Sequence, residues 1–263
     1  MNEKIKKRFY RSLIQKRNFY KFEVKVEQTD LLVIAKKNLK KEIKEEVIRQ
    51  REILKDYIEH HPEFLLSFTP VFAESDQEII KLMSESSFMT KTGPMASVAG
   101  AISEIIGKKF LSLSDEIIIE NGGDIFAKMN SNFIVGIYAG GSPFSMKIGI
   151  KLKKREIPYG VATSSGTVGH SISFGKADAV TVVSSSASFS DGAATYFGNL
   201  VKDRIDKELI ISELKNFVFI EGIVIIKEKE IFLWGDIELI DLINNDKINK
   251  NQLQILGLQE YKI

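Results

Sequence analysis

The chain has 263 residues, of which 44% are hydrophobic and 27% charged, and its formal net charge is +2. These values are typical of a globular protein with one full core, either as one large domain or as one domain with a small appendage. The chain contains no cysteine, which excludes disulfides, cysteine-ligated zinc, iron–sulfur clusters, a cysteine nucleophile, a persulfide on this chain and a lipid-modified cysteine.

The N-terminal part of the chain is basic, since the first fifty residues hold fifteen Lys or Arg against seven Asp or Glu. No apolar signal segment follows, and no apolar run approaches the ~20 residues that span a bilayer. We therefore expect a cytoplasmic protein with no membrane partner. The basic segment suits either an RNA-binding arm or a solvated Lys-rich face. No recognition motif accompanies the charge, so nucleic-acid binding is not expected.

Residues 20–62 are expected to form a β-hairpin and a helix. The segment Phe22–Glu27 alternates apolar and charged residues, turns at Gln28–Asp30 and returns through Leu31–Ala35. Apolar residues from Ile43 onward then recur at near-helical spacing and stop before Pro62. This spacing predicts an amphipathic helix of about five turns.

Two further helices are predicted next. The sequence Ser75–Glu78 fits a capping box that opens a short helix through Met83. Gly93 and Pro94 precede a helix over Met95–Ile106, which is crowded with small residues. Small residues let a helix approach its neighbour closely. We favour tight contact with the sheet over contact with a ligand.

A series of strands follows, with a helix predicted over Ala193–Ile205 and Ser190 as its N-cap. The predicted strands are Glu116–Glu120, Ile125–Met129, Asn132–Tyr138, Ser145–Leu152, Ala177–Ser185, Phe217–Ile226 and Glu230–Gly235. The last twenty residues are expected to be helical or irregular. Together these elements predict an α+β fold, an antiparallel-rich β-sheet with helices packed on it, as a single large domain over residues 1–263.

Two glycine-rich segments suit the binding of an anion. Residues 160–175 read GVATSSGTVGHSISFG, and the turn Asn121–Asp124 follows the apolar run 117–119. Hydroxyls and backbone N–H groups at glycine-permitted turns are groups with which proteins surround phosphate. Both segments lie beside predicted strands, so one polar binding site is expected.

Three sets of side chains are candidates for chemistry. Asp124 suits a ribose hydroxyl or a metal, but it equally suits capping of its own turn. His170 suits a general base or a phosphate contact, and a neutral, backbone-bonded histidine is the competing interpretation. Asp191 and Thr195 lie four residues apart on one face of a predicted helix, where a carboxylate and a hydroxyl can share Mg²⁺. An aspartate near a helix start is also favoured by the helix dipole.

These segments resemble the ApbE-like superfamily, which includes the FAD:protein FMN transferases. The matching residues are Asn121–Asp124, Val161–Gly166 and Ser190–Thr195, in the family's order and strand or helix context over roughly residues 90–235. The whole chain looks like a shorter branch of that superfamily, which shares the run over residues 163–179. The resemblance implies the ApbE-like fold, with the hairpin and helix at 20–62 and a ligand cleft within 90–235.

The resemblance also implies roles for single residues. Asp191 and Thr195 would hold Mg²⁺, with a backbone carbonyl just before Gly93 as a third ligand, and a family aspartate falls near Ser97. FAD or FMN would lie along Asn121, Gly122, Gly123, Asp124, Thr163, Ser164, Ser165, Gly166 and Thr167, with His170 as the catalytic candidate.

Two functions remain open on this resemblance. One is a Mg²⁺-dependent enzyme, a transferase or pyrophosphohydrolase, that acts on a flavin nucleotide or another phosphate ester. The other is a non-catalytic accessory protein with a partner in sulfur assimilation or homocysteine formation. A homodimer is a further expectation, because apolar segments such as Phe217–Ile226 suit either a core or a dimer seam.

Overall fold

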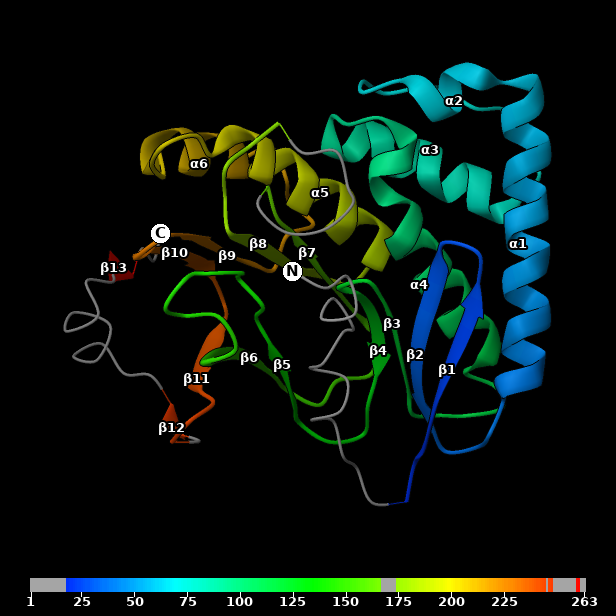
Figure 1. Cartoon of the computed structure of the whole chain (residues 1–263), viewed down its shortest axis with the longest axis horizontal. Coiled ribbons are helices and arrows are strands. Elements are labelled where there is room, and N and C mark those ends of the chain that lie inside the picture. The colour runs from blue at the N-terminus through cyan, green and yellow to red at the C-terminus, as the bar shows by residue number, and fades with distance from the viewer. Residues whose placement is uncertain (1–17, 167–173, 245, 248–258, 261–263) are drawn as a thin grey trace, which may run out of the picture.

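The computed structural model describes residues 18–166, 174–244, 246–247 and 259–260. Within them, a nine-stranded sheet has the order β1-β2-β3-β4-β7-β8-β9-β10-β13, and a four-stranded sheet has the order β12-β11-β6-β5. Neighbouring strands are antiparallel except for the pair β10 and β13. Helices pack on the large sheet (Figure 1), which confirms the predicted α+β fold.

The elements have the following bounds. The strands are β1 (Tyr20–Val26), β2 (Thr29–Ala35), β3 (Ile117–Asn121), β4 (Asp124–Lys128), β5 (Phe133–Gly136), β6 (Ile148–Leu152), β7 (Tyr159–Ser164), β8 (Ala179–Ser184), β9 (Gly222–Lys227), β10 (Glu230–Gly235), β11 (Glu238–Asp241), β12 (Asp246–Lys247) and β13 (Gln259–Glu260). The helices are α1 (Lys40–His60), α2 (Pro62–Leu66), α3 (Glu78–Thr90), the 3₁₀ helix η3 (Pro94–Ser97), α4 (Val98–Phe110), α5 (Ala187–Leu200) and α6 (Lys207–Leu214).

The large sheet is covered on both faces, and strand β8 shows the division. Val180 and Val182 pack in a core shared with α5 and α6, whereas Val183 faces a second core shared with the small sheet. This alternation follows from the two-residue repeat of a strand. A third core joins β2 and β3 to α1, α3 and α4. The part of the chain that is described has no helix with the length and apolarity needed to cross a membrane.

The opening hairpin and the first helix are confirmed. Val26 pairs with Thr29, so the connecting turn is Glu27 and Gln28, one residue earlier than expected. Helix α1 runs as predicted to His60, and Pro62 begins α2. Glu27 takes the positive φ of the turn, at 51°, and its carboxylate pairs with Arg51 and Lys55 of α1.

The predicted capping box at Ser75–Glu78 is wrong. Gln77 is the N-cap of α3 and makes no side-chain cap bond, and the Ser75 hydroxyl accepts from the Gln77 N–H instead. Helix α3 also extends to Thr90, beyond the predicted end at Met83. Its later serines are buried; Ser84, for example, bonds to the backbone of Val71 and Ala73 in the connector that follows α2. These serines therefore form hydrogen bonds with a neighbouring segment, and the helix continues through them.

The predicted helix over Met95–Ile106 has two parts. The 3₁₀ helix η3 occupies Pro94–Ser97, and the α-helix α4 begins only at Val98 and continues to Phe110. The small residues were expected to contact the sheet, and Ala99 does accept a hydrogen bond from Asn121 of β3, but a Cβ added to Gly100 would lie 2.2 Å from the Ala187 carbonyl oxygen of α5. The closest approach at Gly100 is therefore between two helices.

The later elements differ from the prediction in several places. The glycine-rich segment at 160–175 was not predicted to contain a strand, but its first residues belong to β7, in the middle of the large sheet. Helix α5 begins at Ala187, with Ser186 as the N-cap whose side chain accepts from the Phe189 N–H, so Ser190 lies inside the helix. Helix α6 was missed, and β9 begins only at Gly222 because Phe217 packs in an aromatic cluster with Tyr196 and Phe197. Most of the last twenty residues lie outside the described part, but the short strands β12 and β13 within them differ from the expected helical or irregular structure.

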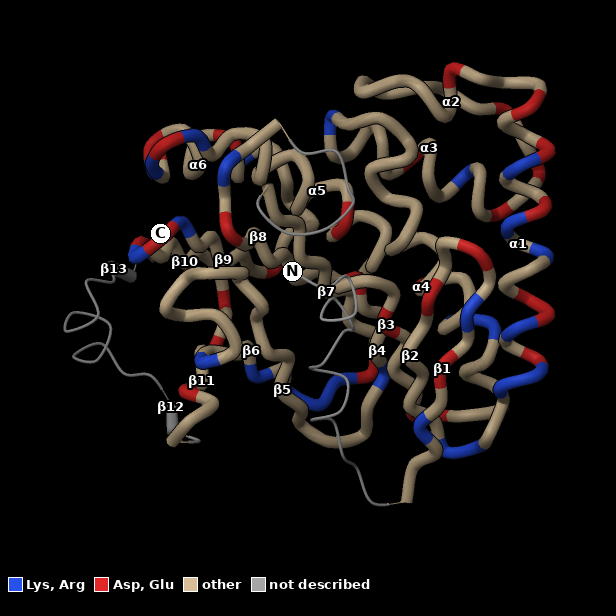
Figure 2. The backbone as a smooth tube through the Cα atoms, in the orientation of Figure 1, with Lys and Arg blue, Asp and Glu red and all other residues tan. Residues whose placement is uncertain are grey.

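Helix α1 is joined to α4 by a buried carboxylate. Basic and acidic residues alternate along α1 (Figure 2), but one of the acidic residues, Glu46, is only 5% exposed. The Glu46 carboxylate accepts hydrogen bonds from Arg49 and Gln50 of α1 and from Lys109 of α4. Burial acts to raise the pKa of Glu46, but these donors outweigh burial and lower the pKa from 4.5 to about 2.

A prediction about acid stability follows from Glu46. Its pKa is depressed in the folded chain, so its stabilising contribution is complete above pH 4.5 and is lost as the pH falls toward 2. Because Arg49 and Lys109 are about half exposed, we expect a loss of about 2 kcal/mol. Glu46→Gln should lack this loss in urea unfolding between pH 7 and pH 2.5, whereas the exposed Glu42→Gln should keep it. Parallel pH profiles for wild type and Glu46→Gln would contradict the prediction.

Candidate functional site

The candidate site lies where α4 and α5 touch. A Cβ at Gly100 would lie 2.8 Å from the Asp191 Cβ as well as against the Ala187 carbonyl, so only glycine fits between the helices here. The Gly100 N–H donates to Asp191 Oδ2 at 2.9 Å, although the two residues are 91 positions apart in sequence. Asp191 therefore supplies a carboxylate to the first turn of α4, whose own N-cap, Ser97, makes no side-chain cap bond.

The environment of Asp191 disfavours its charge. The residue as a whole keeps some exposed surface, but its carboxylate lies between α4 and α5. Burial raises the pKa of Asp191 to about 7, although the N–H groups of Gly100 and Ala99 act in the opposite direction. No Lys or Arg within the described residues forms an ion pair with Asp191. A cation beside this carboxylate would favour its charged form.

Thr195 lies one turn after Asp191 on the same face of α5, as predicted, and Gly198 follows on that face. The two candidates lie one turn further into the helix than expected, because α5 begins at Ala187. Ser164 meets this face from the end of β7, since its Oγ lies 3.7 Å from a Cβ placed at Gly198. One face of α5 therefore carries the Asp191 carboxylate and also contacts the end of β7, where the hydroxyl residues lie.

The Asn121–Asp124 turn lies beside Thr163, in the described first part of the other glycine-rich segment. Gly122 and Gly123 have φ angles of 75° and 122°, which glycine adopts without strain, and a Cβ at Gly123 would lie 3.4 Å from the Thr163 carbonyl oxygen. The Thr163 hydroxyl is bonded to that of Thr181 at 2.9 Å. Strand β4 pairs with β7, which explains why the turn and the strand end meet.

The Asn121–Asp124 turn is also tied to α4. The Asn121 side-chain amide donates to the Ala99 carbonyl at 3.2 Å, and the Ser103 hydroxyl donates to the Asp124 carbonyl at 3.0 Å. Ala99 and Gly100 are consecutive, so Asn121 and Asp191 contact the same turn of α4 from two elements. We use "the α4–α5 site" for these residues together: Gly100, Asn121, Gly122, Gly123, Asp124, Thr163, Ser164, Asp191 and Thr195.

The remaining candidates have other surroundings. Ser97 is fully buried and its hydroxyl donates to the Pro94 carbonyl at 3.0 Å. Gly93 is buried against the connector after α2, where a Cβ would lie 1.8 Å from the Ser67 carbonyl oxygen. The Gly166 N–H donates to the Ala177 carbonyl, and Ser165 is partly exposed. Thr167 and His170 lie outside the described residues.

Glu104 is a residue that sequence reasoning missed. It is 2% exposed on α4, and its Oε2 accepts from the Ser186 hydroxyl at 2.6 Å and from the Ser188 N–H at 3.1 Å. Lys108 pairs with its other oxygen at 2.6 Å. The available signal was a single acidic residue within the sequence Ile-Ser-Glu-Ile-Ile, because a glutamate on an apolar helix is seldom buried without partners.

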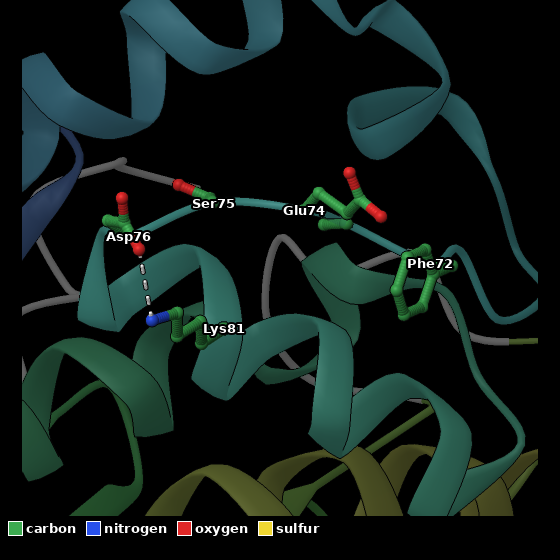
Figure 3. Close-up of a pocket in the computed structure, with 6 residues that line it drawn as sticks. Phe72, Glu74, Ser75, Asp76 and Lys81 are labelled. Atoms are coloured by element: carbon green, nitrogen blue, oxygen red, sulfur yellow. Dashed lines mark ion pairs between the residues drawn. The ribbon is translucent and has the colours of Figure 1, made fainter.

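Surface hollows occur away from these residues. One of about 450 Å³ is lined by the connector between α2 and α3 and by α3 itself (Figure 3), where Lys81 pairs with Asp76 at 3.6 Å. Another of about 560 Å³ is lined mainly by charged and small residues, including Asp178, Asp203 and Glu228. Neither hollow is lined by a residue of the α4–α5 site.

Comparison with known proteins gives relatives in sequence and in fold. The family model described as AbpE bacteria matches residues 11–213. A UPF0280 protein of Methanococcus vannielii is 42% identical over 208 residues, which cover 76% of this chain and 84% of the relative. A UPF0280 protein of Methanocaldococcus jannaschii is 39% identical over 236 residues, which cover 87% of this chain and 95% of the relative.

Solved structures share the fold at low sequence identity. A mutant of the flavin transferase ApbE from Vibrio cholerae superposes with a TM-score of 0.56 and 13% identity, covering 82% of this chain and 96% of that one. The ApbE protein from Thermotoga maritima superposes with a TM-score of 0.51 and 14% identity, covering 84% of this chain and 96% of that one. The likeness is one of fold.

Proposed function

The chain belongs to the family described as AbpE bacteria, and from this premise we propose that it binds a flavin nucleotide together with Mg²⁺ at the α4–α5 site. The observation that carries the proposal is the Asp191 carboxylate, which is held by the first turn of α4 and has no cationic partner among the described residues. The Vibrio cholerae protein that shares the fold is a flavin transferase, which supports flavin as the ligand proposed here.

The side chains around Asp191 fit Mg²⁺. Magnesium takes hard oxygen ligands and keeps several waters, so one carboxylate and one or two neutral oxygens are enough from the protein. Asp191 and Thr195 would supply a carboxylate and a hydroxyl. The loop before Gly93 can add a carbonyl, because η3 packs on α5 and a Cβ at Gly192 would lie 2.5 Å from the Thr90 hydroxyl.

The rest of the site suits a pyrophosphate. The Asn121–Asp124 turn has two glycines at positive φ, and the end of β7 adds the hydroxyls of Thr163 and Ser164. These groups would orient phosphate oxygens, while a bound Mg²⁺ would neutralise their negative charge. The reaction that follows is cleavage of the FAD pyrophosphate bond. With water as the acceptor, one FAD and one water give one FMN and one AMP.

Isothermal titration of the full chain with FAD, FMN and ADP, each with and without Mg²⁺, tests the proposal. We expect FAD to bind only when Mg²⁺ is present, and we expect chromatography of the mixture to detect FMN and AMP. Binding with no products would support a non-catalytic ligand-binding protein. No binding of any of the three with Mg²⁺ would overturn the proposal.

A further inference from the structure

Helices α4 and α5 each supply a carboxylate to the first turn of the other. Asp191 of α5 accepts from the Gly100 N–H of α4, and Glu104 of α4 accepts from the Ser188 N–H of α5. Gly100 and Glu104 are four residues apart on α4, and Ser188 and Asp191 are three apart on α5, so each pair lies on one helix face. The two helices therefore cross in opposite directions, with each N-terminus beside the other's acidic residue.

This arrangement is favourable for both helices. The first four N–H groups of a helix lack partners within it, and a carboxylate there also interacts with the positive end of the helix dipole. Neither N-cap side chain accepts hydrogen bonds from all the N–H groups in the first turn of its helix. Ser97 makes no side-chain cap bond, and Ser186 accepts only from the Phe189 N–H while it donates its own proton to Glu104.

We propose that Glu104 is the positioning residue of the α4–α5 site, because it fixes the first turn of α5 and thereby the Asp191 carboxylate one turn further along. The inference rests on the proposed function for the role of Asp191 as a metal ligand. Glu104 reaches α5 through the Ser186 hydroxyl and the Ser188 N–H. Without those bonds, the first turn of α5 would lose its contacts with the Glu104 carboxylate of α4, and Asp191 would lose its fixed distance from Gly100.

The binding of Mn²⁺ alone, followed by electron paramagnetic resonance on the full chain, tests this role. Glu104→Met keeps the length and volume of the side chain but removes its acceptors, and it should raise the Mn²⁺ Kd by about tenfold or more, as loss of a group that orients a metal ligand does. Glu104→Gln keeps one acceptor oxygen and should stay within about threefold of wild type. The matched control Lys108→Met removes the exposed partner of the same carboxylate and should also stay within that range.

A metal-free measurement separates this inference from the proposed function. In a double-mutant cycle of Glu104→Met and Asp191→Ala, the combined effect on the unfolding equilibrium constant should be at least about fivefold smaller than the product of the single effects. Purely multiplicative effects would overturn the inference, as would equal Mn²⁺ losses in the Met and Gln variants. If Glu104→Met does not fold, a tenfold loss of Mn²⁺ affinity in Glu104→Gln would overturn it. Absence of Mn²⁺ binding to wild type would overturn the proposed function, and the cycle would still decide the role of Glu104.

Discussion

Replacing Asp191 with asparagine is expected to abolish the Mg²⁺-dependent part of flavin nucleotide binding while the chain remains folded. The amide oxygen of asparagine can still accept from the Gly100 N–H, so the contact between α5 and α4 is kept. The negative charge that would hold the cation is lost. A purely structural role of Asp191 predicts the opposite pattern, in which stability falls and ligand binding changes little.

The pH dependence gives an independent check on Asp191. The pKa of its carboxyl is raised from 3.8 to about 7 by burial, so between these values the folded chain holds a proton that the unfolded chain has lost. This group therefore makes the free energy of unfolding decrease as the pH rises from about 4 to 7. Asp191→Asn should remove that decrease, and at pH 8 without metal it should be at least as stable as wild type.

Calorimetric titration with FAD and Mg²⁺ and urea unfolding at pH 5 and pH 8 measure these effects. Asp76→Asn is the matched control, because Asp76 is fully exposed just before α3 and pairs with the half-exposed Lys81. The control should match wild type in both measurements. Metal-dependent FAD binding that persists in Asp191→Asn would remove Asp191 from the site.

Replacing Gly100 with alanine is expected to lower the stability of the fold and also to weaken Mg²⁺-dependent FAD binding at the α4–α5 site. The added methyl group would lie 2.2 Å from the Ala187 carbonyl oxygen and 2.8 Å from the Asp191 Cβ, so α4 and α5 must separate. Overpacking of this kind costs about 1–3 kcal/mol, and we expect the upper end because the closest atom belongs to a helix backbone. The higher helix propensity of alanine offsets about 1 kcal/mol of that cost.

The matched control for Gly100 is Gly141→Ala. A Cβ at Gly141 would meet no atom within 4 Å, so the change should alter the free energy of unfolding by less than about 0.5 kcal/mol. Urea unfolding and Mg²⁺-dependent FAD binding should both be impaired in Gly100→Ala and normal in Gly141→Ala. Wild-type behaviour of Gly100→Ala in both would show that the helices can separate without consequence.

The regular elements were predictable where one physical signal governs them. Period-two alternation identified β1, the turn and the apolar run after it identified β2, and near-helical spacing from Ile43 onward identified α1. Strand β7 was missed because its outer end carries Thr163 and Ser164, whose hydroxyls gave the segment the composition of a loop. One of these hydroxyls is bonded to Thr181 of the neighbouring strand, a partner that the local sequence does not reveal.

The start of α5 shows why caps are hard to place from sequence. The run Ser184–Ser190 contains five serines, and several of them suit an N-cap by residue type. Ser186 takes that position because its hydroxyl also reaches Glu104 of α4, whereas Ser190 bonds to Ser184 and to the Gly160 carbonyl. Contacts with residues far away in the sequence therefore decide which of these serines becomes the N-cap.

The candidate site was predictable in composition but not in arrangement. The residue types at Asn121–Asp124, Thr163–Gly166 and Asp191 pointed to a polar site, and the structure places the turn beside the strand end. The hydrogen bond between Gly100 and Asp191 could not be inferred, because the two residues are 91 positions apart and meet only through the crossing of α4 and α5. Glu104 was missed for the same reason.

The large sheet also constrains the order in which the chain can fold. Strand β2 pairs with β3, although four α-helices and a 3₁₀ helix lie between them, and the Lys36 N–H reaches the Ser114 hydroxyl 78 positions away. Contacts of such long range form slowly, because closing the long intervening segment costs conformational entropy before the contacts are gained. The hairpin can form early by itself, but its pairing with β3 requires closure of the segment that contains α4, the helix that carries Gly100 and Glu104. Late assembly of the sheet edge is therefore the kinetic consequence of placing the helices between two adjacent strands.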